Sequence, residues 1–274
     1  MFKDCLGKNC DKLKDKKLFL FDMDGTIYCE NSLFDGVKEL LNAIKKENGH
    51  YVFITNNASK SVNDYIKKIQ NLGLEVDKDN FLTSVQAAVL HFEKHHNGAR
   101  IYAQGTKSFI KELKDSGLDV TEQYDENADI ILVGFDTEIT AEKMRITSKM
   151  LTVKKDALYY ATNPDWVCPV DFGYIPDCGS MCFGYEKATG RKPTFIGKPQ
   201  PAMINIAMDK FGFSKEETLV IGDRLYTDIA SGYNAGVDTV LVLSGEATMK
   251  DYEESDIKPT FVLNSVKDIL EIKK

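Results

Sequence analysis

The sequence predicts an α/β protein built on parallel sheets. Short apolar runs alternate with segments of helical periodicity along almost the whole chain, which favours strands that are joined through helices. Several of the apolar runs end in small polar or acidic residues, and open α/β sheets place their ligands at the carboxyl ends of the strands. No internal repeat, low-complexity run or long linker interrupts the alternation.

The apolar runs are the expected strands. They are residues 18–21, 51–54, 100–103, 130–134, 158–161, 194–196, 218–221 and 238–243. The expected helices are the segments near 36–47, 60–72, 84–96, 106–116, 140–153, 200–211, 226–235 and 264–272. Ser59 and Thr140 are expected to cap two of these helices at their N-termini, and Gly73, Gly117 and Gly212 follow helical runs as C-terminal caps do.

Composition narrows the class of protein. The chain has 274 residues, which is enough for one large core or two domains. The net charge of -7 disfavours nucleic acid and anionic membranes as partners. No apolar stretch approaches the roughly 18–20 residues of a membrane span, and the charged N-terminus lacks the apolar core of a signal peptide. We therefore expect a cytoplasmic protein whose six cysteines are free thiols.

Two aspartates close the first apolar run. Leu18–Phe21 is followed by Asp22, Met23, Asp24 and Gly25. If the extended path continues through Met23, the two carboxylates share one face, and Gly25 then supplies a sharp turn. Carboxylates held so close repel each other, so one must be protonated or a cation must lie beside them. Either arrangement makes a reactive site.

Three further strand ends carry polar groups. Thr55 and Asn56 follow the run at 51–54, and their hydroxyl and backbone N–H groups suit a phosphate oxygen. Lys198, after Gly197, is a point charge that suits an anion. Asp223 ends the run at 218–221, and Asp228 follows about one helical turn later. If the sheet is parallel, these groups share its carboxyl edge.

These residue types together indicate phosphoryl chemistry. Clustered carboxylates favour a hard cation, and Mg²⁺ is the one that is bound through a few carboxylates, waters and substrate phosphate. One aspartate can then be a nucleophile, because the metal and the lysine offset the repulsion between two anions. The other aspartate can act as general acid and then as general base. The expected ligands are Mg²⁺ and a small phosphorylated metabolite.

Four segments resemble the motifs of the haloacid dehalogenase (HAD) superfamily, in the family order: DMDGT, TNN, GKP and GDRLYTD. The resemblance implies a Rossmann-like parallel-sheet core. It implies that Asp22 is the nucleophile and Asp24 the acid/base, and that Mg²⁺ is bound by Asp22, Asp223 and the Asp24 backbone carbonyl. Thr55, Asn56 and Lys198 would hold the phosphoryl group. Asp228 would orient Lys198 or the waters of the metal.

The spacing of the motifs predicts an inserted domain. Only 33 residues separate Asp22 from Thr55, whereas 143 separate Thr55 from Lys198, far more than one or two crossover units require. We expect a tail at 1–16, a core at 17–79 and 188–274, and an α/β cap at 80–187 that serves as a lid.

The cap position resembles that of the NagD-like phosphatases, which include 4-nitrophenyl phosphatases. VGFDTEITAEKM at 133–144, NPD at 163–165 and PDCGSM at 176–181 resemble their cap motifs. Asn163 and Asp165, which flank a proline, are turn formers and also candidate contacts to substrate. A histidine group at 91, 95 and 96 has a spacing that can bind metal, but we interpret it as an exposed helical face.

The functional expectation is a phosphatase that hydrolyses a small phosphomonoester through an aspartyl phosphate. The substrate classes are sugar phosphates, nucleotides, phosphoglycolate and 4-nitrophenyl phosphate. One alternative is a phosphomutase, although the cap of that family usually follows the first motif, where 33 residues leave no room. The other is a catalytically silent binding or regulatory protein of the same fold, which would be expected to have lost one of the motifs. Exposed cap surfaces allow a homodimer.

Overall fold

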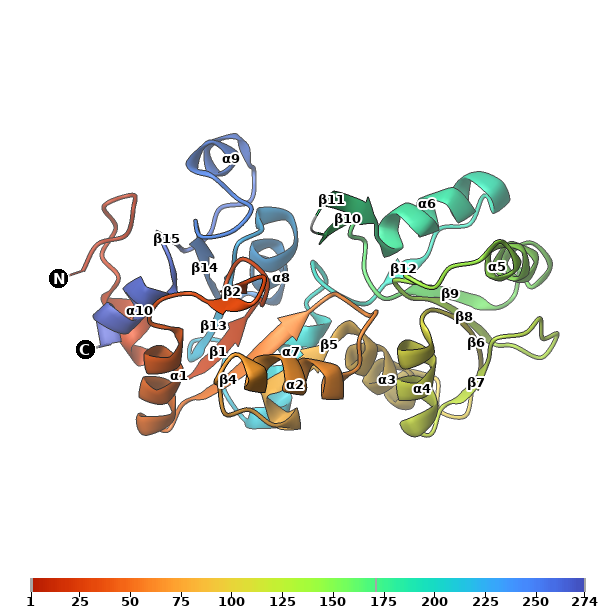
Figure 1. Ribbon diagram of the computed structural model, residues 1–274, viewed down its shortest axis with the longest axis horizontal. Coiled ribbons are helices and arrows are strands. Elements are labelled where there is room, and N and C mark those ends of the chain that lie inside the picture. Colours follow the sequence, from red (N-terminus) through yellow and green to blue (C-terminus); the bar gives the residue numbers. More distant parts are fainter. Residues whose placement is uncertain (1, 171, 274) are drawn as a thin grey trace. The chain divides into compact units, whose positions relative to one another are not determined.

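The computed structural model describes residues 2–170 and 172–273 and divides into two compact units (Figure 1). The first unit comprises Met1–Thr55, Ile66–Leu82 and Lys198–Lys274, and the second comprises Asn56–Tyr65 and Thr83–Gly197. These bounds differ from the expected ones at four places, one of which is 80–82, expected in the cap and found in the first unit. The segment 1–16 lies in the first unit, where the N–H of Cys5 donates to the Val262 carbonyl. Residues 56–65 and 188–197 lie in the second unit.

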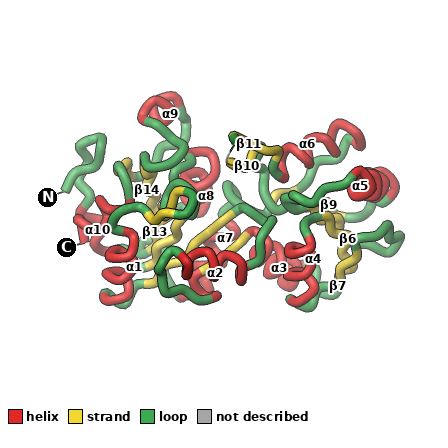
Figure 2. The backbone as a smooth tube through the Cα atoms, in the orientation of Figure 1, coloured by secondary structure: helices red, strands yellow, loops and turns green. Residues whose placement is uncertain are grey.

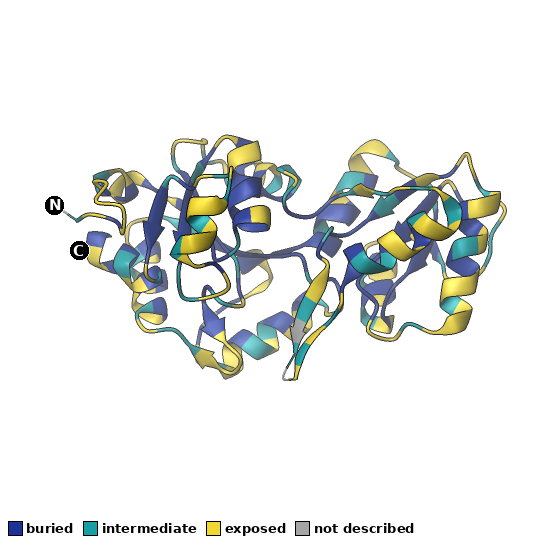
Figure 3. Ribbon diagram, turned by 90° about the horizontal axis from the view of Figure 1, so that it is seen from above, coloured by how far each residue is buried: buried dark blue, intermediate teal, exposed yellow. Residues whose placement is uncertain are grey.

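The sheet of the first unit has six strands, which lie side by side in Figure 2. Their order is β15 (Phe261–Leu263), β14 (Asp238–Val242), β13 (Thr218–Gly222), β1 (Leu18–Phe21), β4 (His50–Thr55) and β5 (Phe81–Thr83). The central strand β1 pairs in parallel with both β13 and β4, so the carboxyl ends of these three strands meet at one edge. All four residues of β1 are buried, and the strands of this sheet are dark blue in Figure 3.

Helices cover this sheet. They are α1 (Val37–Lys46), α2 (Val62–Asn71), α7 (Ala202–Phe211), α8 (Ala230–Ala235), α9 (Met249–Glu254) and α10 (Val266–Lys273), with short helical turns at Asp11–Asp15, Lys78–Asn80 and Leu225–Ile229. A hairpin of β2 (Tyr28–Cys29) and β3 (Ser32–Leu33) follows β1. In α1, Val37, Leu40, Leu41 and Ile44 are buried, which is the spacing of an amphipathic helix, and α1 packs against α10 and β4.

The second unit has its own parallel sheet, in the order β12 (Thr194–Phe195), β9 (Leu158–Ala161), β8 (Ile130–Val133), β6 (Arg100–Gln104) and β7 (Asp119–Thr121). Its helices are α3 (Ser84–His95), α4 (Lys107–Asp115), α5 (Ala141–Val153) and α6 (Cys178–Thr189). An antiparallel hairpin, β10 (Val167–Val170) with β11 (Gly173–Pro176), precedes α6. Each unit is therefore an α/β layer structure, which confirms the expected fold class.

The prediction for Ser59 was wrong. The N–H and hydroxyl of Ser59 bond the Asn57 side chain, while α2 begins at Val62. Ser61 and Asp64 exchange side-chain and backbone hydrogen bonds there, as the two residues of a capping box do. Thr140 does cap α5, because its hydroxyl accepts from the N–H of Lys143. All six cysteines are free thiols. Among the described residues, no helix is long and apolar enough to cross a membrane.

Glu112 on α4 is half-buried, and its Oε2 has no hydrogen-bond partner among the described residues. The pKa of Glu112 is raised to about 7, chiefly by burial; the backbone of Val62 opposes the shift, and Asp64 and Asp115 contribute to it. A raised pKa means that the folded chain retains a proton that the unfolded chain has released. The contribution of this group to stability is thus present below its unfolded pKa and is lost as the pH rises through about 7.

Glu112→Gln is therefore expected to stabilise the chain at high pH only. We expect about 2 kcal/mol more free energy of unfolding above about pH 8, and little change near pH 5, where the carboxyl is already neutral. Urea denaturation at both pH values measures the difference. Glu126→Gln, at an exposed glutamate of the same unit, is the matched control. An equal gain at both pH values would contradict the explanation.

Candidate active site

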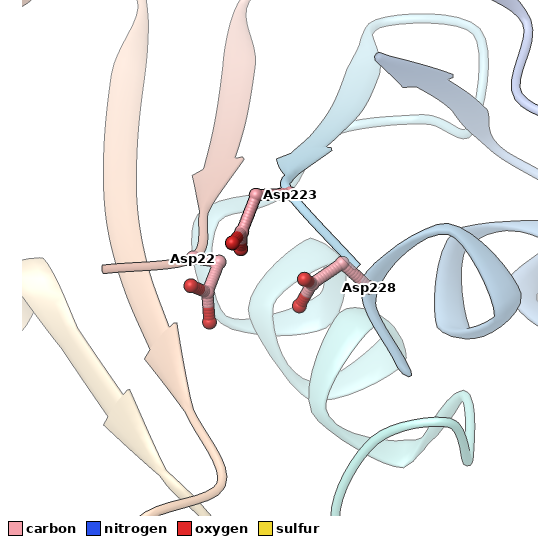
Figure 4. Close-up of side chains that lie close together, drawn as sticks. All are labelled: Asp22, Asp223 and Asp228. Atoms are coloured by element: carbon pink, nitrogen blue, oxygen red, sulfur yellow. The ribbon is translucent and has the colours of Figure 1, made fainter. Parts of the chain in front are cut away.

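Most of the predicted site residues meet at the carboxyl edge of the first unit. Asp22 follows β1, Thr55 ends β4, and Asp223 follows β13, so the parallel pairing of these strands brings them together. Asp228 lies in the helical turn Leu225–Ile229. Figure 4 shows the side chains of Asp22, Asp223 and Asp228 facing one another. Carboxylate oxygens of all three lie within 4.8 Å of one another. We call these three residues the acidic trio.

Lys198 connects two members of the acidic trio. Its buried ammonium donates to Oδ1 of Asp22 and to Oδ1 of Asp228, at 2.6 Å in each case, and to the carbonyl of Ile54 at 3.2 Å. Burial lowers the pKa of Lys198, but the two carboxylates outweigh that effect and raise it above its usual value. Lys198 therefore stays charged, and Asp228 orients it.

The acidic trio carries more negative charge than Lys198 offsets. Three carboxylates face two cationic side chains, Lys198 and Arg224, and Asp22 keeps 16% of its side chain exposed. Burial raises the pKa of Asp22, Asp228 and Asp223 add to the shift, and Lys198 opposes it. The repulsion between the carboxylates of such a site is relieved by a bound cation or by a proton.

Asp223 has a free coordination position. Its Oδ2 accepts from the N–H of Glu246 at 2.7 Å, but its buried Oδ1 has no partner within the described part of the chain. The pKa of Asp223 is raised to about 6, chiefly by burial and then by the charge of Asp228. A buried oxygen without a partner costs about 1–3 kcal/mol, which a bound cation would recover. The donor set consists of carboxylate oxygens, so these residues fit a hard divalent cation.

Two glycines let the backbone close around Asp223. A Cβ on Gly25, where φ is +85°, would lie 2.3 Å from Asp223 Oδ2, and a Cβ on Gly245 would lie 2.0 Å from the same oxygen. The Ser244 hydroxyl donates to the Gly25 carbonyl at 2.8 Å and joins the two loops. Residues 244–246 were not among the predicted site residues. The signal was present, because the apolar run at 238–243 also ends in a small polar residue and a glycine.

Gly245→Ala is expected to displace the Asp223 carboxylate, since a Cβ cannot lie 2.0 Å from its oxygen. We expect kcat/KM to fall about 100-fold and more Mg²⁺ to be needed for half-maximal activity. Gly184→Ala is the matched control, because nothing lies within 4 Å of a Cβ there. If Gly245→Ala retained wild-type kcat/KM and metal dependence, the role given to this loop would be wrong.

Asp24 lies apart from the acidic trio. Its exposed carboxylate accepts from the Tyr28 hydroxyl at 2.9 Å and lies 3.7 Å from the ammonium of Lys68, which itself lies over the Tyr28 ring. The condition for a shared face, an extended path through Met23, is not met. The chain turns there, because the N–H groups of Thr26 and Ile27 bond the Met23 carbonyl. Neither Tyr28 nor Lys68 was singled out from the sequence, and only packing shows their contacts with Asp24.

The remaining predicted residues form a buried network in the second unit. The Asn56 amide donates to Asp165 at 3.1 Å, and the Asn163 amide donates to Asp165 at 3.1 Å and to Asp177 at 3.2 Å. Asn163 is fully buried, so in this structure it holds chain segments together. The roles of Asn56 at phosphate, and of Asn163 and Asp165 at substrate, stay predictions. Thr55 is buried at the end of β4.

Comparison with known families agrees with this arrangement. Residues 19–119 match a family model described as haloacid dehalogenase-like hydrolase, and residues 195–269 match one described as HAD-hydrolase-like. An acid sugar phosphatase of Staphylococcus haemolyticus is 32% identical over 257 residues, which cover 94% of this chain and 95% of that protein.

Several solved structures are also similar to this chain. The 4-nitrophenylphosphatase of Thermotoga maritima is 38% identical with a TM-score of 0.91, covering 96% of this chain and 99% of its own. NagD of Escherichia coli K-12 is 32% identical with a TM-score of 0.83, covering 92% and 97%. A glycerol phosphate phosphatase of Mycobacterium tuberculosis in complex with magnesium is 27% identical with a TM-score of 0.86, covering 94% and 77%.

Three observations point to the same family: the acidic trio with Lys198, the order of the motifs, and the similarity to these proteins. The chain belongs to the haloacid dehalogenase-like hydrolases and is a phosphatase of their NagD and 4-nitrophenyl phosphatase type.

Proposed function

We propose that this phosphatase is Mg²⁺-dependent and hydrolyses small phosphomonoesters through an aspartyl phosphate on Asp22. The observation that carries the proposal is the pairing of Lys198 with Asp22 beside the unpartnered oxygen of Asp223. It supplies a nucleophile, a fixed positive charge and an open position for a cation at one edge of the sheet. The names of the relatives support sugar phosphates, glycerol phosphate and 4-nitrophenyl phosphate as substrate classes. The proposed substrates also include nucleotides and phosphoglycolate.

In the proposed reaction, a carboxylate oxygen of Asp22 bonds to phosphorus as the bond to the leaving oxygen breaks. Lys198 and Thr55 hold the phosphoryl oxygens, and Asp24 gives its proton to the leaving oxygen. Asp24 then takes a proton from water, whose oxygen bonds to phosphorus as the Asp22–phosphorus bond breaks. Mg²⁺, held by Asp22, Asp223 and the Asp24 carbonyl, would neutralise charge on the phosphoryl group and on the trio.

The test is phosphate release with Mg²⁺ from a panel of sugar phosphates, glycerol phosphate, nucleoside monophosphates, phosphoglycolate and 4-nitrophenyl phosphate. We expect release, and a preference of several decades in kcat/KM would identify the substrate class. A flat profile would indicate a generalist. Failure to release phosphate from every member of the panel would contradict the proposal.

Asp24→Ala tests the acid/base role. Removing the proton donor should slow turnover by about 10²–10⁴-fold for a sugar phosphate, whose alkoxide leaves poorly, and less for 4-nitrophenyl phosphate, whose phenolate needs no proton. Tyr28→Phe, which keeps the carboxylate and removes only its hydrogen bond, should cause a smaller loss. Steady-state kinetics with both substrates measure the contrast. Equal losses on the two substrates would argue against general acid catalysis by Asp24.

A further inference from the structure

Three of the four histidines of the chain lie together at the C-terminal end of α3. His91 and His95 are one helical turn apart, and His96 is the C-terminal cap residue of the helix. The ring centroid of His91 lies 4.9 Å from that of His95 and 5.7 Å from that of His96. We call these three residues the histidine cluster. It lies in the second unit, and the phosphatase chemistry proposed above does not use it.

The environment of His91 favours a neutral imidazole. Its Nε2 is buried and has no hydrogen-bond partner among the residues that the structure describes. Burial lowers the pKa of His91, and His95 and His96 lower it further. Neutral imidazole is the form that binds metal ions. At neutral pH His91 therefore holds a buried lone pair or N–H group that no described residue satisfies.

The separations of the rings suit a shared metal ion. With metal–nitrogen bonds of about 2.1 Å and tetrahedral angles, two imidazoles on one ion have centroids roughly 5 Å apart. The observed 4.9 Å and 5.7 Å bracket that value closely. The carbonyl end of a helix also favours a cation.

We propose that His91, His95 and His96 bind a divalent transition metal ion such as Ni²⁺ or Zn²⁺. Imidazole suits these ions, whereas the carboxylates of the acidic trio suit Mg²⁺. In the described residues, only the acidic trio already has three such ligand atoms within 4.8 Å of one another. Binding at the histidine cluster therefore requires a ring to rotate, and the exposed ring of His95 can do so.

Tyr160 on β9 is a positioning residue for this site. Its hydroxyl lies 3.0 Å from Nε2 of His96, and its ring contacts the rings of His91 and His96. A bound metal selects the tautomer in which Nε2–H of His96 donates to the tyrosine oxygen, because this leaves the lone pair of Nδ1 for the ion. Imidazole ligands commonly donate their second N–H to an oxygen in this way. The ion would thus link α3 to β9.

The test is calorimetric titration of the full-length chain with Ni²⁺, with Mg²⁺ present in large excess so that the acidic trio does not compete. We expect one Ni²⁺ per chain. His95→Asn should weaken binding at least about tenfold, and the double variant His91→Asn with His95→Asn should abolish it. Tyr160→Phe should weaken binding by a smaller factor. His50→Asn, which removes the remaining histidine of the chain, is the control and should bind as the wild type does.

Two further measurements distinguish Ni²⁺ binding at the histidine cluster from binding by cysteine thiols and from an effect of unfolding. Binding should decline below about pH 6, where imidazole takes up a proton. Ni²⁺ should raise the melting temperature of the wild type and not that of His95→Asn, a substitution at an exposed position that leaves the core intact. The proposal is overturned if the wild type binds no Ni²⁺ under these conditions, or if His95→Asn binds as tightly as the wild type.

Discussion

Replacing Asp22 by asparagine is expected to abolish phosphate release from 4-nitrophenyl phosphate, with a loss of at least about 10⁴-fold in kcat. An amide oxygen is a poor nucleophile, so no aspartyl phosphate can form. The change is nearly isosteric, and Lys198 keeps its bond to Asp228. The fold should therefore persist, and the loss should fall on the chemical step. Acid quenching during turnover should trap phosphorylated protein in the wild type and none in Asp22→Asn.

Asp79→Asn is the matched control for this experiment. Asp79 is an aspartate of the same unit that pairs with Lys210 at the surface. Its amide should leave kcat unchanged, because it touches none of the residues at the carboxyl edge. Turnover of Asp22→Asn within tenfold of the wild type would show that another group attacks phosphorus, and the nucleophile would have to be reassigned.

Removal of divalent cations with EDTA is expected to stop phosphate release, and excess Mg²⁺ to restore it. The acidic trio offers three carboxylates against two cationic side chains, Lys198 and Arg224. A phosphomonoester would add more negative charge at the same place. Without a cation the substrate and the nucleophile repel each other, and the buried Oδ1 of Asp223 stays unsatisfied. Activity against Mg²⁺ concentration is the measurement.

Asp223→Asn tests whether Asp223 itself contributes to binding the metal ion. The amide keeps the size of the side chain and can still accept from the N–H of Glu246, but it removes one negative charge from the trio. We expect the Mg²⁺ concentration for half-maximal activity to rise at least about tenfold. Full activity in the presence of the chelator, or an unchanged metal requirement in Asp223→Asn, would show that the trio does not bind the cation.

Local pattern predicted the strand ends well. Asp22 and Asp223 follow runs that are buried on both faces, and such runs are recognisable from composition alone. Short elements were missed, because β7, β10, β11 and α9 are each too short to show a period. The bounds of the units could not be predicted from local pattern either, because contacts between segments such as β12 and β9 decide them.

The amino-acid sequence by itself determined which residue types stand at the ends of the parallel strands, and hence the chemistry that they can perform. This is possible because burial on both faces of a strand and the alternation of side chains along it are both visible in the order of neighbouring residues. Only the tertiary structure decided that Lys198 joins Asp22 to Asp228, that Gly25 and Gly245 leave room for Oδ2 of Asp223, and that Tyr160 faces the histidine cluster. These contacts join residues far apart in the chain, and packing, which no local pattern encodes, sets their distances.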